Sequence, residues 1–174
     1  MLGMPPKIIR PFPEDVLGTL RKFVQVGRAR YSREPLHCLK SNRWQEYNNP
    51  LLKQLHRQRS LVDTASEIFG EPVMPSYVFL SMYSSQGVCA AHRDRPQCKY
   101  TVNLCISQDK PWPLYIENLA DGTFDEVILG EGDAVLFSGT DQTHYRKPMA
   151  ENGGSFCDVA HFHLVPVGFS GTLA

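Results

Sequence analysis

The sequence has 174 residues, of which 42% are hydrophobic and 21% are charged, and its formal net charge is zero. This length suits one domain, and the composition argues against disordered, collagen-like and coiled-coil chains. No stretch approaches the roughly 20 consecutive apolar residues that a membrane-spanning helix needs, and the N-terminal sequence lacks the apolar segment of a secretory signal.

The cysteines are odd in number and irregularly spaced, and no two of them form a CxxC pair that would suggest zinc. This usage is typical of reduced thiols in the cytoplasm, which is the location that we expect. The five residues are Cys38, Cys89, Cys98, Cys105 and Cys157.

Charge is distributed unevenly along the chain. Residues 1–60 contain 12 basic residues (Lys and Arg) and 4 acidic residues (Asp and Glu), whereas residues 61–174 contain 6 basic and 14 acidic residues. Such a basic segment either offers a surface to an anionic partner or lies against the acidic remainder of the chain. The basic residues are scattered and form no run, so the second interpretation is favoured.

The first third of the chain has helical periodicity. Pro13, Glu14 and Asp15 are typical of a helix start, and apolar residues recur at helical spacing directly after them. These apolar residues are Val16, Leu17, Leu20, Phe23 and Val24.

A second helical pattern follows a loop rich in Arg, Ser and Pro. Asn49 and Pro50 are typical of a capping residue and a first helical position, and Gly70 is typical of a helix end. The pattern between them predicts one long helix over about residues 50–69. Its apolar stripe consists of Leu51, Leu55, Val62, Ala65 and Phe69.

After Pro75 the pattern changes to short strands separated by Gly, Pro, Asp or Asn. Eight strands after helices predict a mainly β fold with N-terminal helices, in which the strands form a jelly-roll barrel and the helices cover one sheet. We expect a single domain over residues 1–174, with a helical support in residues 1–73 and the β core in residues 74–166. The expected strands are 77–83, 88–93, 99–106, 113–117, 124–128, 133–138, 143–147 and 155–165.

A histidine and an aspartate two residues apart end the second expected strand. Alternate residues of a strand share a face, so His92 and Asp94 present an imidazole and a carboxylate to one point. A second histidine, His144, lies in the seventh expected strand. Two histidines and one carboxylate on one face of a metal ion form the facial triad of non-haem Fe(II) oxygenases. An isolated HxD pair is a weak signal, but the strand context and His144 strengthen the prediction of a metal site.

Two segments, YSSQGVCAAHRD and GEGDAVLFSGTDQTHYRKP, resemble the Fe(II)/2-oxoglutarate-dependent dioxygenases, nearest in pattern to the prolyl-hydroxylase-like and AlkB-like branches. The resemblance covers residues 74–166, and residues 1–73 carry no recognised motif. Besides the HxD pair and a final apolar strand, the matching residues are Tyr83 nine positions before His92, and Gly132, Asp133 and Phe137 before His144.

This resemblance implies a double-stranded β-helix, a cupin-like jelly roll, in which His92, Asp94 and His144 bind Fe(II). It also implies that 2-oxoglutarate chelates the iron and that O₂ is consumed. The products are succinate, CO₂ and a substrate hydroxylated at a C–H bond, or demethylated where that carbon is an N-methyl group. Asp94 favours hydroxylase chemistry, because halogenating relatives carry a small residue in its place. The implied substrate is a small molecule or an amino-acid side chain.

The distal carboxylate of 2-oxoglutarate requires a cation, which many members of the family place about ten residues after the second histidine. Here that region reads ENGGSFC and contains no Arg or Lys. We expect Arg146 to replace it, because Arg146 lies two residues after His144 and therefore on the same strand face. Tyr83 and Ser81 are expected to assist. The alternative cations are Lys147, Lys99, Arg93 and Arg95.

Polar residues that alternate in two expected strands have open roles. Thr101, Asn103 and Cys105 share one strand face, and the sequence does not indicate whether this face or the opposite apolar face lines the cavity. His161 and His163 in the last strand are either a second metal pair or buried core histidines, of which the latter is favoured.

Two other functions remain open beside a hydroxylase. One is an AlkB-type demethylase of nucleic acid, served by the basic N-terminal third, although no dense basic patch interleaved with aromatic residues is present. The other is a non-catalytic, cupin-like metal-binding module, for which the missing late arginine is the main support.

Overall fold

The computed structural model describes residues 4–173; residues 1–3 and 174, part of the expected range 1–174, lie outside the described residues. The elements are β1 (Lys7–Ile9), α1 (Glu14–Tyr31), β2 (Arg43–Tyr47), α2 (Pro50–His56), α3 (Arg59–Phe69), β3 (Val73–Tyr83), β4 (Cys89–His92), β5 (Tyr100–Gln108), β6 (Leu114–Glu117), β7 (Phe124–Val127), β8 (Ala134–Ser138), β9 (His144–Arg146) and β10 (Cys157–Pro166), with short 3₁₀ helices at Pro96–Cys98 and Met149–Asn152. None of the described helices is long and apolar enough to cross a membrane. All five cysteines are free thiols; Cys98, Cys105 and Cys157 are buried, whereas Cys38 and Cys89 are partly exposed.

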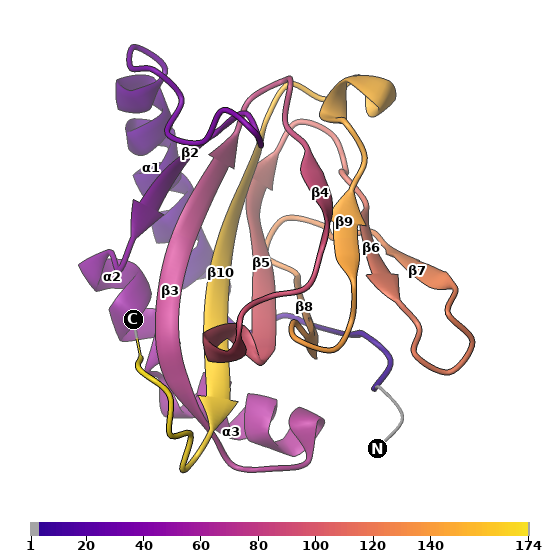
Figure 1. Ribbon diagram of the computed structural model, residues 1–174. Coiled ribbons are helices and arrows are strands. Elements are labelled where there is room, and N and C mark those ends of the chain that lie inside the picture. Colours follow the sequence, from indigo (N-terminus) through magenta and orange to yellow (C-terminus); the bar gives the residue numbers. More distant parts are fainter. Residues whose placement is uncertain (1–3, 174) are drawn as a thin grey trace.

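Two antiparallel sheets form the jelly roll that the sequence predicts (Figure 1). The larger has the strand order β1-β8-β5-β10-β3-β2, and the smaller has the order β4-β9-β6-β7. The three helices lie against the outer side of the larger sheet. The inner side of that sheet faces the smaller sheet, and apolar residues of β5, β8, β6 and β7 form a second core between them.

The strands of the larger sheet bury both faces, because helices cover one and the smaller sheet covers the other. On β5, Val102 and Leu104 belong to the core beneath the helices. The alternate residues Thr101, Asn103 and Cys105 therefore point into the space between the sheets, which answers the question that the sequence left open.

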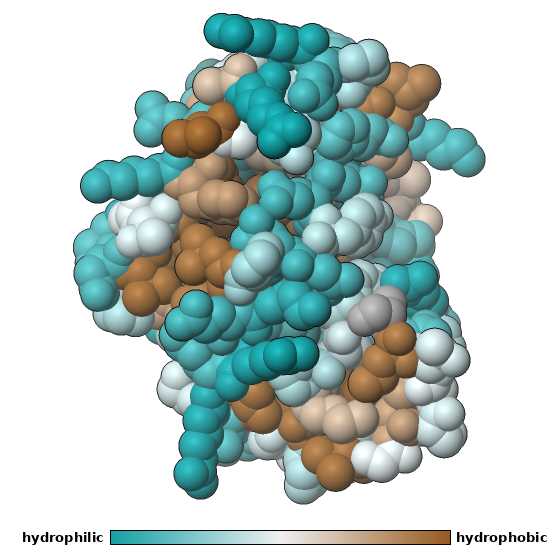
Figure 2. Space-filling view, turned by 90° about the vertical axis from the view of Figure 1, so that its left-hand side faces the viewer, coloured by the Kyte–Doolittle hydropathy of each residue, from teal (hydrophilic) through white to brown (hydrophobic). Residues whose placement is uncertain are grey.

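The face over the helices is mainly hydrophilic, with apolar side chains gathered in a few places (Figure 2).

The first helical prediction is confirmed by α1, which begins at Glu14 and buries Leu17, Leu20 and Val24. The predicted start and end of the second helical region are also confirmed. The Asn49 side chain accepts a hydrogen bond from the Leu51 amide at 2.9 Å.

The prediction of one helix over residues 50–69 is wrong, because α2 ends at His56 and α3 begins at Arg59. Gln58 between them has an extended backbone. The break changes which residues face the sheet. Leu52 and Leu61 are fully buried, while the predicted Leu51 and Val62 are only half-buried. Both short helices pack on β3.

All eight predicted strands are present, with ends that differ by a few residues. Two edge strands were not predicted. The first, β1, has only three residues and pairs with β8. The second, β2, pairs with β3 in a register that places Arg43 opposite Tyr83. Its sequence RWQEY contains too few apolar residues for a clear alternation.

Ion pairs tie the basic N-terminal third to the acidic remainder of the chain, in line with the favoured interpretation of the charge pattern. Arg10 pairs with Asp133 at 3.3 Å, and Arg28 of α1 pairs with the buried Asp158 of β10. Arg28 also donates to the Tyr83 carbonyl at 3.1 Å, and the Ser107 hydroxyl donates to Asp158 at 2.8 Å. Arg28 thus fastens α1 to the strand at the centre of the sheet.

We expect Arg28→Ala to lower the free energy of unfolding by about 2–4 kcal/mol, because it leaves the Asp158 carboxylate buried without its cation. The matched control is Arg59→Ala, which breaks an exposed pair with Asp63 and should cost less than about 0.5 kcal/mol. Urea unfolding of both variants provides the comparison. Equal losses for the two variants would contradict the assigned role of Arg28.

Candidate metal centre and adjoining cavity

The register of the smaller sheet brings the two predicted histidines together. His92 is the last residue of β4 and His144 is the first of β9, and the two lie opposite each other in the antiparallel pair. Asp94 follows in the turn after β4; it does not lie on the strand as its spacing had suggested. The ligand atoms of the three residues all lie within 4.8 Å of one another.

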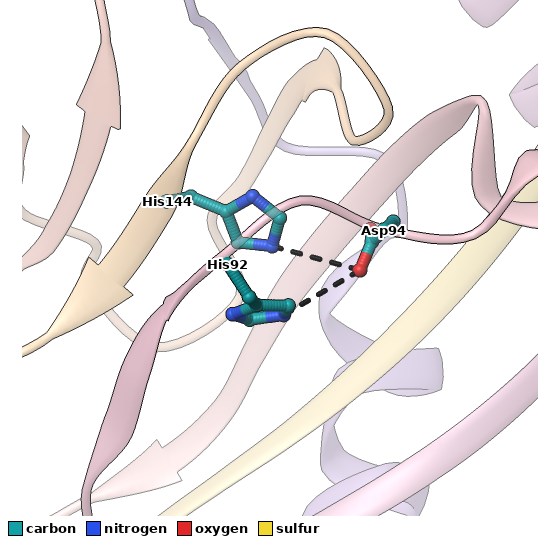
Figure 3. A group of neighbouring side chains, drawn as sticks. All are labelled: His92, Asp94 and His144. Atoms are coloured by element: carbon teal, nitrogen blue, oxygen red, sulfur yellow. Dashed lines mark ion pairs between the residues drawn. The ribbon is translucent and has the colours of Figure 1, made fainter.

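One oxygen of Asp94 is the meeting point of the group (Figure 3). Oδ1 lies 3.5 Å from Nε2 of His92 and 3.7 Å from Nε2 of His144. The other nitrogen of each ring is bound to a backbone carbonyl. Nδ1 of His92 donates to Ala90 at 2.8 Å, and Nδ1 of His144 donates to Gln142 at 3.0 Å.

These carbonyl contacts fix the tautomer of both rings. A carbonyl only accepts, so each Nδ1 carries a proton and Nε2 is the nitrogen of each ring that can offer a lone pair to a metal. On His92 the metal would replace the Nε2 proton that Asp94 stabilises. Two nitrogen lone pairs and one carboxylate oxygen therefore converge, which is the donor set that a divalent transition metal ion takes in a facial arrangement. The hydrogen bond to Asp94 raises the pKa of His92 to about 10, whereas burial lowers the pKa of His144. The carboxylate thus favours a positive charge at this point.

A hydrogen-bonded chain holds the second oxygen of Asp94. Thr101 Oγ1 lies 3.2 Å from Asp94 Oδ2 and 3.0 Å from Nδ1 of His163. The carboxylate only accepts, so the hydroxyl hydrogen goes to Asp94, and His163 donates from Nδ1 to Thr101. Burial lowers the pKa of His163 to about 4, which keeps its ring neutral. The chain orients the carboxylate so that Oδ1 faces both Nε2 nitrogens.

We expect Thr101→Val to weaken metal binding about 10- to 100-fold, the range found when a residue that orients a metal ligand is lost. Valine keeps the shape of threonine but removes the hydroxyl that holds Asp94. Calorimetric titration with Ni(II) measures the effect. The matched control is Thr123→Val, which removes a hydroxyl bound to Asp121 at 2.7 Å in a distant loop. Wild-type affinity in Thr101→Val would exclude this role for the hydroxyl.

A close approach of backbone to the site explains Gly139. The Asp94 amide donates to the Gly139 carbonyl at 2.8 Å. A Cβ atom at position 139 would lie 2.3 Å from Oδ2 of Asp94 and 2.6 Å from the carbonyl of Cys98. Any side chain here would push the carboxylate away, so the site requires glycine at this position.

A cavity of about 610 Å³ opens beside the three ligands between the two sheets. Of the residues predicted to bind a cosubstrate, Arg146 and Tyr83 line it. Arg146 is 5% exposed; it donates to the Trp112 carbonyl and lies 4.9 Å from the Trp112 ring. Tyr83 accepts a hydrogen bond from Arg43 at 2.6 Å, and burial raises its pKa to about 12. Ser81 is fully buried but is not among the residues that line the cavity.

Of the alternative cations, only Arg95 lines the cavity. Arg93 pairs with Glu117 at 3.1 Å, and Lys99 pairs with Glu71 at 3.3 Å. Lys147 is exposed and lies over the ring of Tyr115.

The sequence analysis missed Arg43, which lines the cavity from the edge strand β2. Its only possible signal was the alternation of RWQEY, in which the buried Trp44 points to the helices. Arg43 reaches the cavity because β2 pairs with β3, a contact between residues about 40 positions apart in the chain.

The two histidines of β10 lie in the inner face of the larger sheet, not on its surface. His163 belongs to the chain of contacts behind Asp94. His161 lies 3.3 Å from the Asn103 amide, and both rings stack near Phe79. Asp94, Cys98 and His163 also place ligand atoms within 4.8 Å of one another, but they share the carboxylate of the first group.

Solved structures of low sequence identity share this fold. AviO1 from Streptomyces viridochromogenes Tue57 matches with a TM-score of 0.78 at 15% identity, over 98% of this chain and 94% of that chain. HygX from Streptomyces hygroscopicus, with nickel and 2-oxoglutarate bound, matches with a TM-score of 0.73 at 10% identity, over 95% and 84%. A Pseudomonas putida prolyl-4-hydroxylase matches with a TM-score of 0.67 at 14% identity, over 91% and 92%.

No protein-family model and no curated protein sequence matches this chain. The structural matches establish the fold, and they confirm the jelly roll that the resemblance implied.

Proposed function

We propose that this protein is an Fe(II)/2-oxoglutarate-dependent oxygenase that hydroxylates a small molecule or an amino-acid side chain. The observation that carries the proposal is the convergence of His92, Asp94 and His144 at the edge of a cavity whose wall holds a buried arginine. The fold match to HygX, which binds nickel and 2-oxoglutarate, and to a prolyl-4-hydroxylase supports it.

The three side chains would hold the metal through Nε2 of each histidine and Oδ1 of Asp94. The carbonyls behind the histidines and Thr101 behind Asp94 keep these atoms aimed at one point. Bound there with 2-oxoglutarate, Fe(II) supplies the activation of O₂ that yields succinate, CO₂ and a hydroxylated C–H bond. The carboxylate of Asp94 fills the position that a halide takes in halogenating relatives, which favours hydroxylation.

Arg146 would bind the distal carboxylate of the cosubstrate. It lies two residues along β9 from His144, and two residues of a strand span about 7 Å, a separation that a five-carbon dicarboxylate bridges. Its planar fork suits a carboxylate, and burial strengthens the contact. The Tyr83 hydroxyl lines the same cavity and would donate a further hydrogen bond.

Apolar side chains would keep water from the reacting end of the cavity. The ring of Phe137 packs against His144 with a centroid distance of 4.7 Å, and Leu114 lines the same wall. Exclusion of water strengthens the electrostatic contacts of the ligands and protects the reactive site from side reactions.

The two other functions have weaker support. Several arginines of the basic N-terminal third are engaged in ion pairs, which leaves fewer cations for a nucleic-acid backbone than a demethylase would use. The case for a non-catalytic module rested on the missing late arginine, and Arg146 and Arg43 supply cations in the cavity from other strands.

Calorimetric titration of 2-oxoglutarate into anaerobic protein, with and without Fe(II), tests the proposal. We expect binding that depends on the metal, followed by succinate formation when O₂ is admitted. Binding of iron without binding of the cosubstrate would overturn the proposal in favour of a cupin-like metal-binding module.

A further inference from the structure

The cavity beside the metal site has an excess of positive charge. Four cations line it, and Asp94 supplies the only carboxylate among its lining residues. None of the four is in an ion pair with any residue of the described range 4–173, although Arg10, Arg28 and Arg93 are paired elsewhere. A divalent metal and a dicarboxylate cosubstrate neutralise each other, so the excess would remain in the loaded site. The four cations are Lys40, Arg43, Arg95 and Arg146.

Neutral partners hold the guanidinium of Arg43 in place. Its Nη1 donates to the Tyr83 hydroxyl at 2.6 Å. With the Gln45 amide turned to satisfy both groups, the Gln45 oxygen accepts from Nη2 at 2.8 Å and from Nε at 3.0 Å. Three of the five N–H groups are thereby used, and each terminal nitrogen keeps one N–H. Arg43 is oriented but its charge is not compensated.

Lys40 belongs to the same end of the cavity. It lies in the turn of residues 39–42, which Cys38 and Arg43 close by a bridge in both directions. Lys40 is exposed at the cavity mouth, whereas Arg43 is half-buried. An exposed ammonium group outside and a hydrogen-bonded guanidinium inside form a suitable pair for an oxyanion that enters from solvent.

An aromatic wall extends from Arg43 along β3. The guanidinium lies 5.8 Å from the centre of the Phe79 ring, and the Phe79 and Tyr77 rings stack with 6.0 Å between their centres. Tyr47 lies 5.4 Å from Phe79 and is 57% exposed. Such rings bind the flat face of a cyclic or planar group.

We infer that Arg43 and Lys40 form an anion-binding subsite for the substrate, which is a small organic anion whose carboxylate or phosphate they bind while its ring lies against the exposed Tyr47 at the end of the aromatic wall. Arg146 takes the cosubstrate and Arg43 takes the substrate. The inference rests on the proposed function and narrows it to anionic substrates.

Phenyl phosphate, with phenol as its uncharged counterpart, is the probe that tests this subsite. Ligand-observed NMR titration is performed on protein loaded with Ni(II) and saturating 2-oxoglutarate, so that the metal and Arg146 are already engaged. We expect phenyl phosphate to bind at least about 10-fold more tightly than phenol, since hydrogen bonds to charged groups contribute about 1.5–3 kcal/mol. Arg43→Gln should remove this advantage and weaken 2-oxoglutarate binding far less than Arg146→Gln does.

Two further variants control for charge and folding. Arg33→Gln removes the same charge from an exposed position outside the cavity and should bind phenyl phosphate as the wild type does. Arg43→Lys keeps the charge but loses the fork, and it should bind with intermediate affinity.

Three results would overturn the inference: no binding of phenyl phosphate by the loaded wild type, equal binding by Arg43→Gln, or loss of 2-oxoglutarate binding in Arg43→Gln. Failure of the proposed function gives a different result. In that case the metal-loaded wild type does not bind 2-oxoglutarate, while phenyl phosphate still binds through Arg43.

Discussion

Asp94→Ala is expected to abolish metal-dependent turnover of 2-oxoglutarate. It should also weaken Ni(II) binding more than about 100-fold, which is the upper end of the loss caused by removing a residue that only orients a ligand. The reason is geometric. Oδ1 of Asp94 is the atom that both Nε2 nitrogens face, at 3.5 and 3.7 Å. Without it, two neutral imidazoles remain and no anion opposes the charge of the metal.

Calorimetry with Ni(II) measures this loss without recourse to activity, and thermal unfolding verifies that the variant folds. Asp94→Asn tests charge at constant shape. Its matched control is Glu126→Gln, which neutralises an exposed carboxylate of β7 outside the cavity. His92→Ala should behave like Asp94→Ala. Near wild-type Ni(II) affinity in either variant would show that His92, Asp94 and His144 do not form a metal site.

Arg146→Gln is expected to weaken 2-oxoglutarate binding about 30-fold or more, because loss of one partner of a buried charged pair costs 2–5 kcal/mol. Metal affinity should stay within a factor of about three, because Arg146 is not one of the three residues whose ligand atoms converge. Calorimetric titration of the metal-free variant with Ni(II), followed by titration of the loaded variant with 2-oxoglutarate, measures the two affinities in turn.

Lys147→Gln is the control for Arg146→Gln, since it removes a charge from the adjacent residue, whose side chain is exposed and lies over Tyr115. Arg146→Lys should restore part of the affinity, because a point charge replaces the fork. Unchanged 2-oxoglutarate binding in Arg146→Gln would mean that the distal carboxylate is bound by Arg43 or Arg95, the other arginines of the cavity.

Local patterns in the sequence predicted what depends on neighbours along the chain. The strands, the cap at Asn49 and the end at Gly70 follow from periodicity and turn chemistry, which act over a few residues. The spacing of His92 and Asp94 also predicted a shared target, although the structure achieves it with a turn held by Gly139 and not with a continuous strand.

What the sequence could not predict depends on pairing between distant segments. The break at Gln58 lets α2 and α3 each pack on β3, a contact that the helix sequence does not contain. Arg43 enters the cavity because of the register between β2 and β3, and His163 acts on Asp94 through a threonine on a neighbouring strand. Each is a contact of high sequence separation, and no periodicity within one segment encodes it.

The short strand β9 carries both His144 and Arg146 on one face, and Tyr145 between them stacks outward on Tyr115. A shift of one residue would turn Tyr145 inward and both functional side chains outward. Substitutions would therefore separate the two proposed roles, whereas a single-residue insertion or deletion in this strand would remove both together.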